Sequence, residues 1–156
     1  MRLFRLILLL LVLAPVASQA THIIGGDIQY KYVGDSSGVP NQYRIKLVIY
    51  REASGAGMQP TETVQVASSS CGITQNVTVN LSVPEFSAAV YGAFDCIPQS
   101  SAVFTPMVRI YTGFVILSQQ CPDYKMSWSL CCRPGGITGI TGSGGVGFYF
   151  EAELNN

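Results

Sequence analysis

Hydrophobic side chains recur at every second position through most of this 156-residue chain. The clearest runs are residues 43–49, 77–83 and 124–130, and the same period appears at 28–32, 64–66, 108–117 and 148–154. Successive side chains of an extended strand point to opposite faces. Such alternation therefore predicts strands with one buried and one wetter face. We expect seven or eight of them.

Turn-forming residues lie between almost all of these runs. Clusters of Gly, Pro, Asn and Ser occupy residues 34–41, 53–57, 133–136 and 139–145, and no stretch shows a convincing helical period. Short strands punctuated in this way indicate an all-β, antiparallel β-sandwich of the immunoglobulin-like kind, with a closed barrel as the alternative. Residues 21–156 are expected to form one such domain. Its hydrophobic core is large enough that disulfides would supplement the packing and not replace it.

The first twenty residues have the features of a secretory signal peptide. Arg2 and Arg5 give a positive start, residues 6–13 are all apolar, and Ser18 and Ala20 suit the positions that a signal peptidase reads. The apolar run is too short to span a membrane, which needs about twenty residues. We expect cleavage after Ala20, export, and a mature chain without a membrane span.

Charge and histidine content argue against several classes of function. Loss of the leader leaves seven basic and nine acidic side chains, with no basic cluster of the kind that binds nucleic acid. His22 is the one histidine, which disfavours a Ser-His-Asp triad and histidine-based metal sites. No enzyme, catalytic residue, cofactor or metal site is predicted.

Acidic residues and glycines also fit plain structural interpretations. Five carboxylates are scattered singly among loops and strand ends, which favours a solvated surface over a catalytic pair: Asp27, Asp35, Glu52, Asp95 and Asp123. The glycine-rich stretch 135–147 lacks the lysine and following helix of a phosphate-binding loop, so we interpret it as a hairpin connection.

The five cysteines are expected to form disulfides, because export permits them and no metal-binding spacing is present. Cys121 and Cys131 bracket a predicted strand and would lie roughly 25–33 Å apart, whereas a disulfide needs Cα atoms within about 7 Å. Cys121 should therefore pair with Cys71 or Cys96. Cys132 shares the parity of the apolar positions of that strand and should face the core, while Cys131 faces outward.

Two blocks of sequence resemble a known family. Residues 21–30 (THIIGGDIQY) with 42–51, and residues 111–117 with 121–133 (CPDYKMSWSLCCR) and 147–156, are similar to the amino-terminal module of large exported surface proteins of Bacteroidetes. In those proteins the module is often followed by PKD-like or other immunoglobulin-like repeats, and the far end typically carries a gliding-motility-associated or type IX sorting domain. This chain departs from the pattern at Pro134 and Gly135, and it stops where relatives continue into further domains.

The resemblance implies a disulfide pattern. Members that lack counterparts of both Cys71 and Cys121 keep the paired cysteines, which implies a Cys71–Cys121 bond. Cys96 is then left for Cys131, and Cys132 becomes a buried free thiol.

The resemblance also implies a function: a non-catalytic, exported structural or adhesion module at the cell surface, which continues into or assembles with further surface domains. Its ligand, a glycan or a protein, is not specified. The alternative is a free-standing secreted protein that binds a glycan or peptide through tyrosines on one sheet face. Tyrosine also suits half-buried strand positions, which is the simpler interpretation of the eight tyrosines: Tyr30, Tyr32, Tyr43, Tyr50, Tyr91, Tyr111, Tyr124 and Tyr149.

Overall fold

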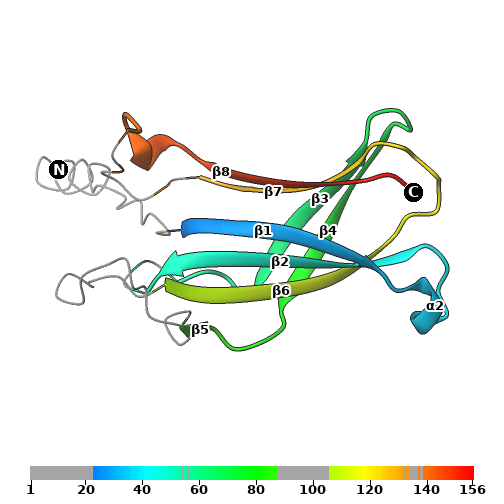
Figure 1. Cartoon of the computed structure of the whole chain (residues 1–156), viewed down its shortest axis with the longest axis horizontal. Helices are drawn as coiled ribbons and strands as arrows, with labels where there is room; N and C mark the ends of the chain where they lie inside the picture. Colours follow the sequence, from blue (N-terminus) through cyan, green and yellow to red (C-terminus); the bar gives the residue numbers. More distant parts are fainter. Residues whose placement is uncertain are drawn as a thin grey trace, which may run out of the picture.

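The computed structural model describes residues 23–53, 55, 57–87, 106–131, 133, 137 and 139–156. Their elements in chain order are β1 (Ile23–Tyr32), α2 (Gly34–Ser37), β2 (Gln42–Glu52), β3 (Thr61–Ser68), β4 (Ile73–Leu81), β5 (Phe86–Ser87), β6 (Pro106–Ile116), β7 (Tyr124–Leu130), η3 (Ser143–Gly145) and β8 (Phe148–Leu154) (Figure 1). All strand pairs are antiparallel. The predicted all-β class and strand number are confirmed.

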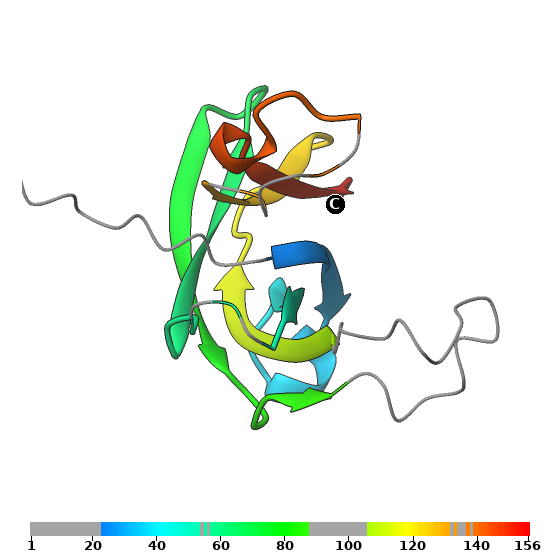
Figure 2. The same ribbon diagram turned by 90° about the vertical axis from the view of Figure 1, so that its left-hand side faces the viewer.

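The strands form a sandwich made by folding one sheet over on itself. The strand order is β1-β2-β6-β4-β3-β7-β8, with β5 beside β6. One layer holds β1, β2 and β6, and the other holds β7 and β8 with β3 and β4 crossing obliquely between the layers (Figures 1 and 2). The layers are joined at a short ladder of two residue pairs, Asn80 with Thr112 and Leu81 with Tyr111.

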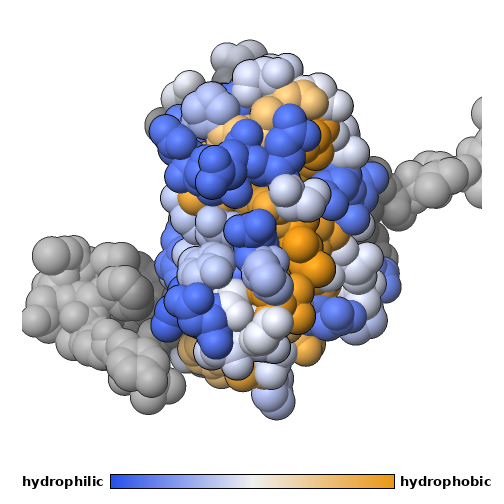
Figure 3. Space-filling model, turned by 90° about the vertical axis from the view of Figure 1, so that its right-hand side faces the viewer, coloured by the Kyte–Doolittle hydropathy of each residue, from blue (hydrophilic) through white to orange (hydrophobic). Residues whose placement is uncertain are grey.

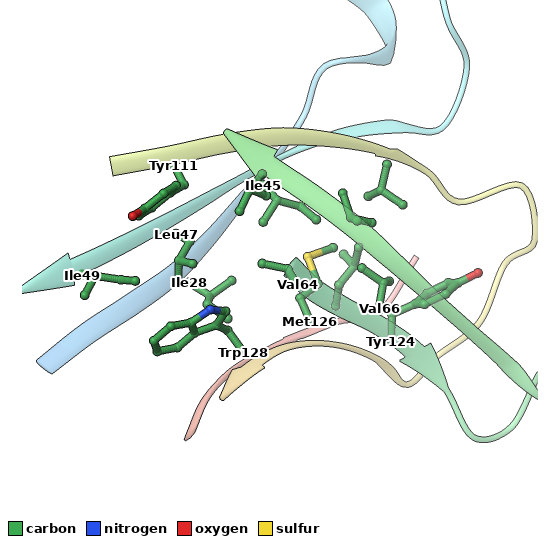
Figure 4. Close-up of a cluster of buried hydrophobic side chains, with 14 of the residues drawn as sticks. Ile28, Ile45, Leu47, Ile49, Val64, Val66, Tyr111, Tyr124, Met126 and Trp128 are labelled. Carbon is green, nitrogen blue, oxygen red and sulfur yellow. The ribbon is translucent and has the colours of Figure 1, made fainter. Parts of the chain in front are cut away.

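The core lies between the layers and uses the positions that the period-two pattern predicted to face inward. From β2 it takes Ile45, Leu47 and Ile49, all fully buried, and from β7 it takes Met126 and Trp128 (Figure 4). The exposed residues of β7 alternate with these, as expected for a strand with one solvated face. The alternation therefore assigned the core-facing side of both strands correctly.

The two ends of the folded sheet meet where β1 passes β8. The Tyr30 hydroxyl donates a hydrogen bond of 2.8 Å to the Glu153 carbonyl oxygen, and the Phe150 ring packs against Gly26. A Cβ on Gly26 would lie 2.4 Å from that ring and 2.6 Å from the Val48 carbonyl oxygen. Gly26 is thus required by close packing.

Gly113 permits the crossing of β4 over β6. A Cβ on Gly113 would lie 2.7 Å from the Thr78 carbonyl oxygen and 2.8 Å from Val79 Cγ1. Any side chain there would push the two strands apart. After this crossing β4 and β6 share no further ladder among the described residues, so the sheet opens on the outer side of the sandwich.

Candidate ligand-binding groove

The polar side chains inside the sandwich are held by structural partners. Arg51 is 8% exposed and forms a two-pronged ion pair with Glu85, in which Nη2 lies 3.0 Å from Oε2. Its Nη1 also donates to the carbonyl oxygens of Glu52 and Gly55. The hydrogen bonds from Arg51 hold the pKa of Glu85 below its usual value. This pair anchors the segment after β4 to the end of β2.

A second interior group surrounds Glu62. The Trp128 Nε1–H donates to Glu62 Oε2 at 3.1 Å, and Arg109 lies near enough to interact electrostatically. Burial raises the pKa of Glu62 and outweighs those two favourable interactions. Arg109 itself donates to the Met58 carbonyl oxygen, and the Tyr111 hydroxyl donates to that of Gln59 at 2.9 Å. These contacts tie the loop before β3 to β6.

Asp123 fixes the turn between β3 and β4. Its carboxylate accepts hydrogen bonds from the hydroxyls of Ser68 and Ser70 and from the Ser70 amide. These bonds lower the pKa of Asp123 to about 2. The sequence placed Asp123 among scattered surface carboxylates, whereas the structure gives it a defined structural role beside the Cys71–Cys121 disulfide.

The disulfide between Cys71 and Cys121 confirms the predicted pairing, and the two Cα atoms lie 6.2 Å apart. Cys131 is also disulfide-bonded. Its predicted partner Cys96 lies outside the described residues, as does Cys132, so both of those predictions stay predictions. The Cys132 prediction assumed that every second side chain of β7 faces the core. This is confirmed for Trp128 and for Leu130, which is partly buried.

The tyrosines do not gather on one outer sheet face. Tyr111 and Tyr124 are in the core, Tyr50 and Tyr149 are exposed on different layers, and Tyr91 lies outside the described residues. A separate group packs edge to face at the end of the sandwich near α2: Tyr30, Tyr32 and Tyr43. The described tyrosines therefore divide among core, half-buried and exposed strand positions.

An open groove lies where β4 and β6 diverge. It has a volume of about 450 Å³ and is lined by Phe114, Val115 and Ile116 of β6, residues 75–78 of β4, and Gln42 of β2. Phe114 is 56% exposed and Ile116 is 51% exposed. Viewed from this end, the surface shows an apolar band bordered by hydrophilic side chains (Figure 3). We call this site the β4–β6 groove.

A second groove of about 340 Å³ adjoins the first and shares Gln42 and Phe114 with it. Its other lining residues come from α2 and β2, and include Ser36, Ser37 and Arg44. Arg44 is the one charged side chain among the described residues that line the two grooves. Phe114 stands opposite Arg44 in the β2–β6 register, so an aromatic ring and a cation are neighbours on this face.

Three cations on this outer face differ from Arg51 and Lys125 in having no carboxylate partner among the described residues. Lys31 stands directly opposite Arg44, and Lys46 follows Arg44 on the same face of β2. Within the described part of the chain, neither these two lysines nor Arg44 forms an ion pair. By contrast, Arg51 and Lys125 have carboxylate partners. We call Lys31, Arg44 and Lys46 the cationic row.

Sequence reasoning did not find this groove or the row. The alternation predicts which side chains face outward, but the approach of Lys31 to Arg44 depends on strand register. The groove depends on where two strands distant in sequence part from each other. A partial signal was present, since Phe114 and Ile116 occupy outward positions of an apolar run.

Several residues named in the sequence analysis fall outside the described residues. His22, Asp95 and the leader 1–20 are among the residues outside. Within the described ranges, no group of three or more His, Cys, Asp or Glu side chains has a metal-binding arrangement. In the same ranges, no helix has the length and apolar character needed to cross a membrane.

Comparisons of the chain with protein-family models, with curated proteins and with solved structures find no match. The geometry of the groove and the features of the sequence therefore carry the functional argument.

Proposed function

We propose that this chain is a non-catalytic, exported module that acts in adhesion or assembly at a bacterial cell surface. The observation that carries the proposal is a difference between the inner and the outer side chains. Interior carboxylates with altered pKa are engaged by structural partners, as Glu85 is by Arg51. The outer face instead presents exposed apolar side chains, and cations without an ion pair among the described residues, around a groove.

Two further features support this proposal, the first its export and the second its binding role. The leader predicted from residues 1–20 directs a chain to an oxidising compartment, where a disulfide such as Cys71–Cys121 is stable. The groove is a shallow surface feature on a sheet, with amide, hydroxyl and aromatic side chains. Such a surface suits contact with an extended ligand better than the sequestration of a reacting group.

The proposal is tested by expressing the full chain with its own leader and a carboxy-terminal epitope tag in a Bacteroidetes host. We expect antibody to label intact cells, amino-terminal sequencing to begin at Thr21, and attachment to surfaces to exceed that of a strain lacking the chain. The matched control is Leu9→Arg, which interrupts the apolar run of the leader and should abolish surface labelling. A tag reached only after lysis, or a retained Met1, would contradict the proposal.

The alternative, a free-standing secreted binding protein, is favoured by the groove itself but not by the arrangement of tyrosines. The two functions predict different locations for the tagged chain. A secreted binding protein accumulates in the culture medium at the mass of residues 21–156, whereas a surface module stays with the cells. Immunoblotting of medium and cell fractions separates them.

A further inference from the structure

We propose that the β4–β6 groove and the adjoining groove bind an acidic polysaccharide, with the cationic row neutralising its carboxylate or sulfate groups. The inference deepens the proposed surface function and rests on it, because it names the class of ligand that such a module would bind.

The cationic row is unusual because none of the described carboxylates forms an ion pair with it. Lys31 and Arg44 stand directly opposite each other on neighbouring strands, an arrangement of like charges that lowers stability. Asp27, on the same face of β1, receives a hydrogen bond from Gln29 rather than from a cation. The face therefore carries positive charge that none of the described residues neutralises through an ion pair, and an anionic ligand complements it.

The groove beside the row supplies contacts that a sugar chain uses. Phe114 is more than half exposed and stands beside Arg44 across the β2–β6 ladder, so its ring is available to the apolar face of a pyranose. Gln42, Gln75 and Asn76 contribute amides, and each amide can both donate to and accept from hydroxyl groups. Thr78 adds a hydroxyl.

The geometry favours a linear chain over a small compact ligand. The two grooves adjoin at Gln42 and Phe114 and extend from β4 across β6 to α2, so successive sugar units have separate places to lie. No carboxylate side chain lines either groove within the described residues, so an acidic sugar meets no repulsion from the lining. An acidic peptide shares the charge but makes less use of the amide-lined wall.

The test is calorimetric titration of the purified exported chain at low salt with polygalacturonate oligosaccharides, with neutral dextran oligosaccharides of equal length for comparison. We expect polygalacturonate to bind, dextran to bind at least tenfold more weakly, and the polygalacturonate association constant to fall as sodium chloride is raised. Arg44→Gln should lower that constant by tenfold or more, and Phe114→Ala by about fivefold.

Matched controls lie on the other layer of the sandwich. Lys125→Gln removes an exposed cation and Tyr149→Ala an exposed aromatic ring, and both variants should bind polygalacturonate within twofold of the unaltered chain. Circular dichroism verifies that all four variants are folded. The salt dependence measured on the unaltered chain tests the charge argument without any substitution.

Three results would overturn the inference. These are equal binding of dextran, equal weakening by Lys125→Gln and Arg44→Gln, and binding of poly-glutamate but not polygalacturonate, which would assign an acidic peptide instead. If the tagged chain is displayed and promotes attachment while polygalacturonate fails to bind, the ligand assignment is wrong and the surface function stands. If polygalacturonate binds but the tag stays inside cells, the surface function is wrong.

Discussion

The β2–β6 strand pair carries an arginine and an aromatic side chain on each of its two faces, and the two faces treat them differently. Inside, Arg51 is nearly buried and paired with Glu85, and Tyr111 is fully buried. Outside, Arg44 and Phe114 are exposed and adjacent. The two arginines are separated by an odd number of residue steps along β2, and Tyr111 and Phe114 by an odd number along β6. Because successive side chains of a strand alternate, the members of each pair lie on opposite faces.

The arginine and aromatic residues of the inner face stabilise the fold, whereas those of the outer face are available to a ligand. The inner residues are surrounded by partners that satisfy their charge and their hydrogen-bonding groups, so their interactions stabilise the fold. The outer arginine has no carboxylate partner among the described residues, so its charge is available to a ligand. Substitutions that are alike in chemistry but differ in face should therefore have very different effects.

The largest difference is expected between the two aromatic residues. Tyr111→Ala removes a fully buried ring and its hydrogen bond to Gln59, and should lower the free energy of unfolding by about 4 kcal/mol. Phe114→Ala should lower it by only about 0.5 kcal/mol, because more than half of that side chain is exposed. Urea unfolding monitored by Trp128 fluorescence measures both. Equal losses would show that Phe114 supports the core.

The two arginines give the next largest difference. Arg51→Met leaves Glu85 without its partner and should cost about 3 kcal/mol, since a partly buried carboxylate loses its counter-charge. Arg44→Met should change stability by less than about 0.5 kcal/mol. The double variant Arg51→Met with Glu85→Leu should recover most of the loss, because no unpaired charge remains. If it recovers nothing, the contacts of Arg51 with the Glu52 and Gly55 carbonyl oxygens dominate.

The inner pair should also make stability depend on pH. The pKa of Glu85 is lowered by its hydrogen bonds to Arg51, so its contribution is fully present above the ordinary glutamate value of 4.5. That contribution is lost as the pH falls through the lowered pKa of the folded state. Glu85→Gln should therefore reduce the loss of stability on acidification, in urea titrations between neutral pH and pH 3.

Glu62 supplies the opposite sign and serves as the control. Burial raises its pKa, so it contributes stability below its ordinary value and loses that contribution as the pH rises through the raised pKa. Glu62→Gln should therefore favour the folded state more at neutral pH than at acid pH, relative to the unaltered chain. The same sign of change in both variants would contradict these assignments.

The sequence predicted most of the fold because period two determines both the strand and its buried face. Residues 43–49 and 124–130 show this directly, since their apolar members line the core. The same rule also applies to one charged residue. Arg51 continues the inward parity of Ile45, Leu47 and Ile49, and an arginine at a core position requires a partner such as Glu85.

The candidate site could not be predicted in the same way. The β4–β6 groove exists because two strands separated by a long stretch of chain meet in two residue pairs and then diverge. Alternation within one strand contains no information about that crossing. Gly113 marks the crossing, but in the sequence alone a single glycine within a strand has several interpretations.

The smallest effect is expected within the cationic row, and it should have the opposite sign to the others. Lys31 and Arg44 repel each other across the β1–β2 ladder, so Lys31→Gln should raise the free energy of unfolding by about 0.3 kcal/mol at low ionic strength. At 1 M salt the Debye length is about 3 Å, so the gain should disappear. Lys125→Gln, which removes a cation paired with Glu151, should destabilise the chain instead. A destabilising Lys31→Gln would mean that Lys31 has a stabilising partner in the folded chain, and the outer face would then lack the uncompensated charge that distinguishes it from the inner face.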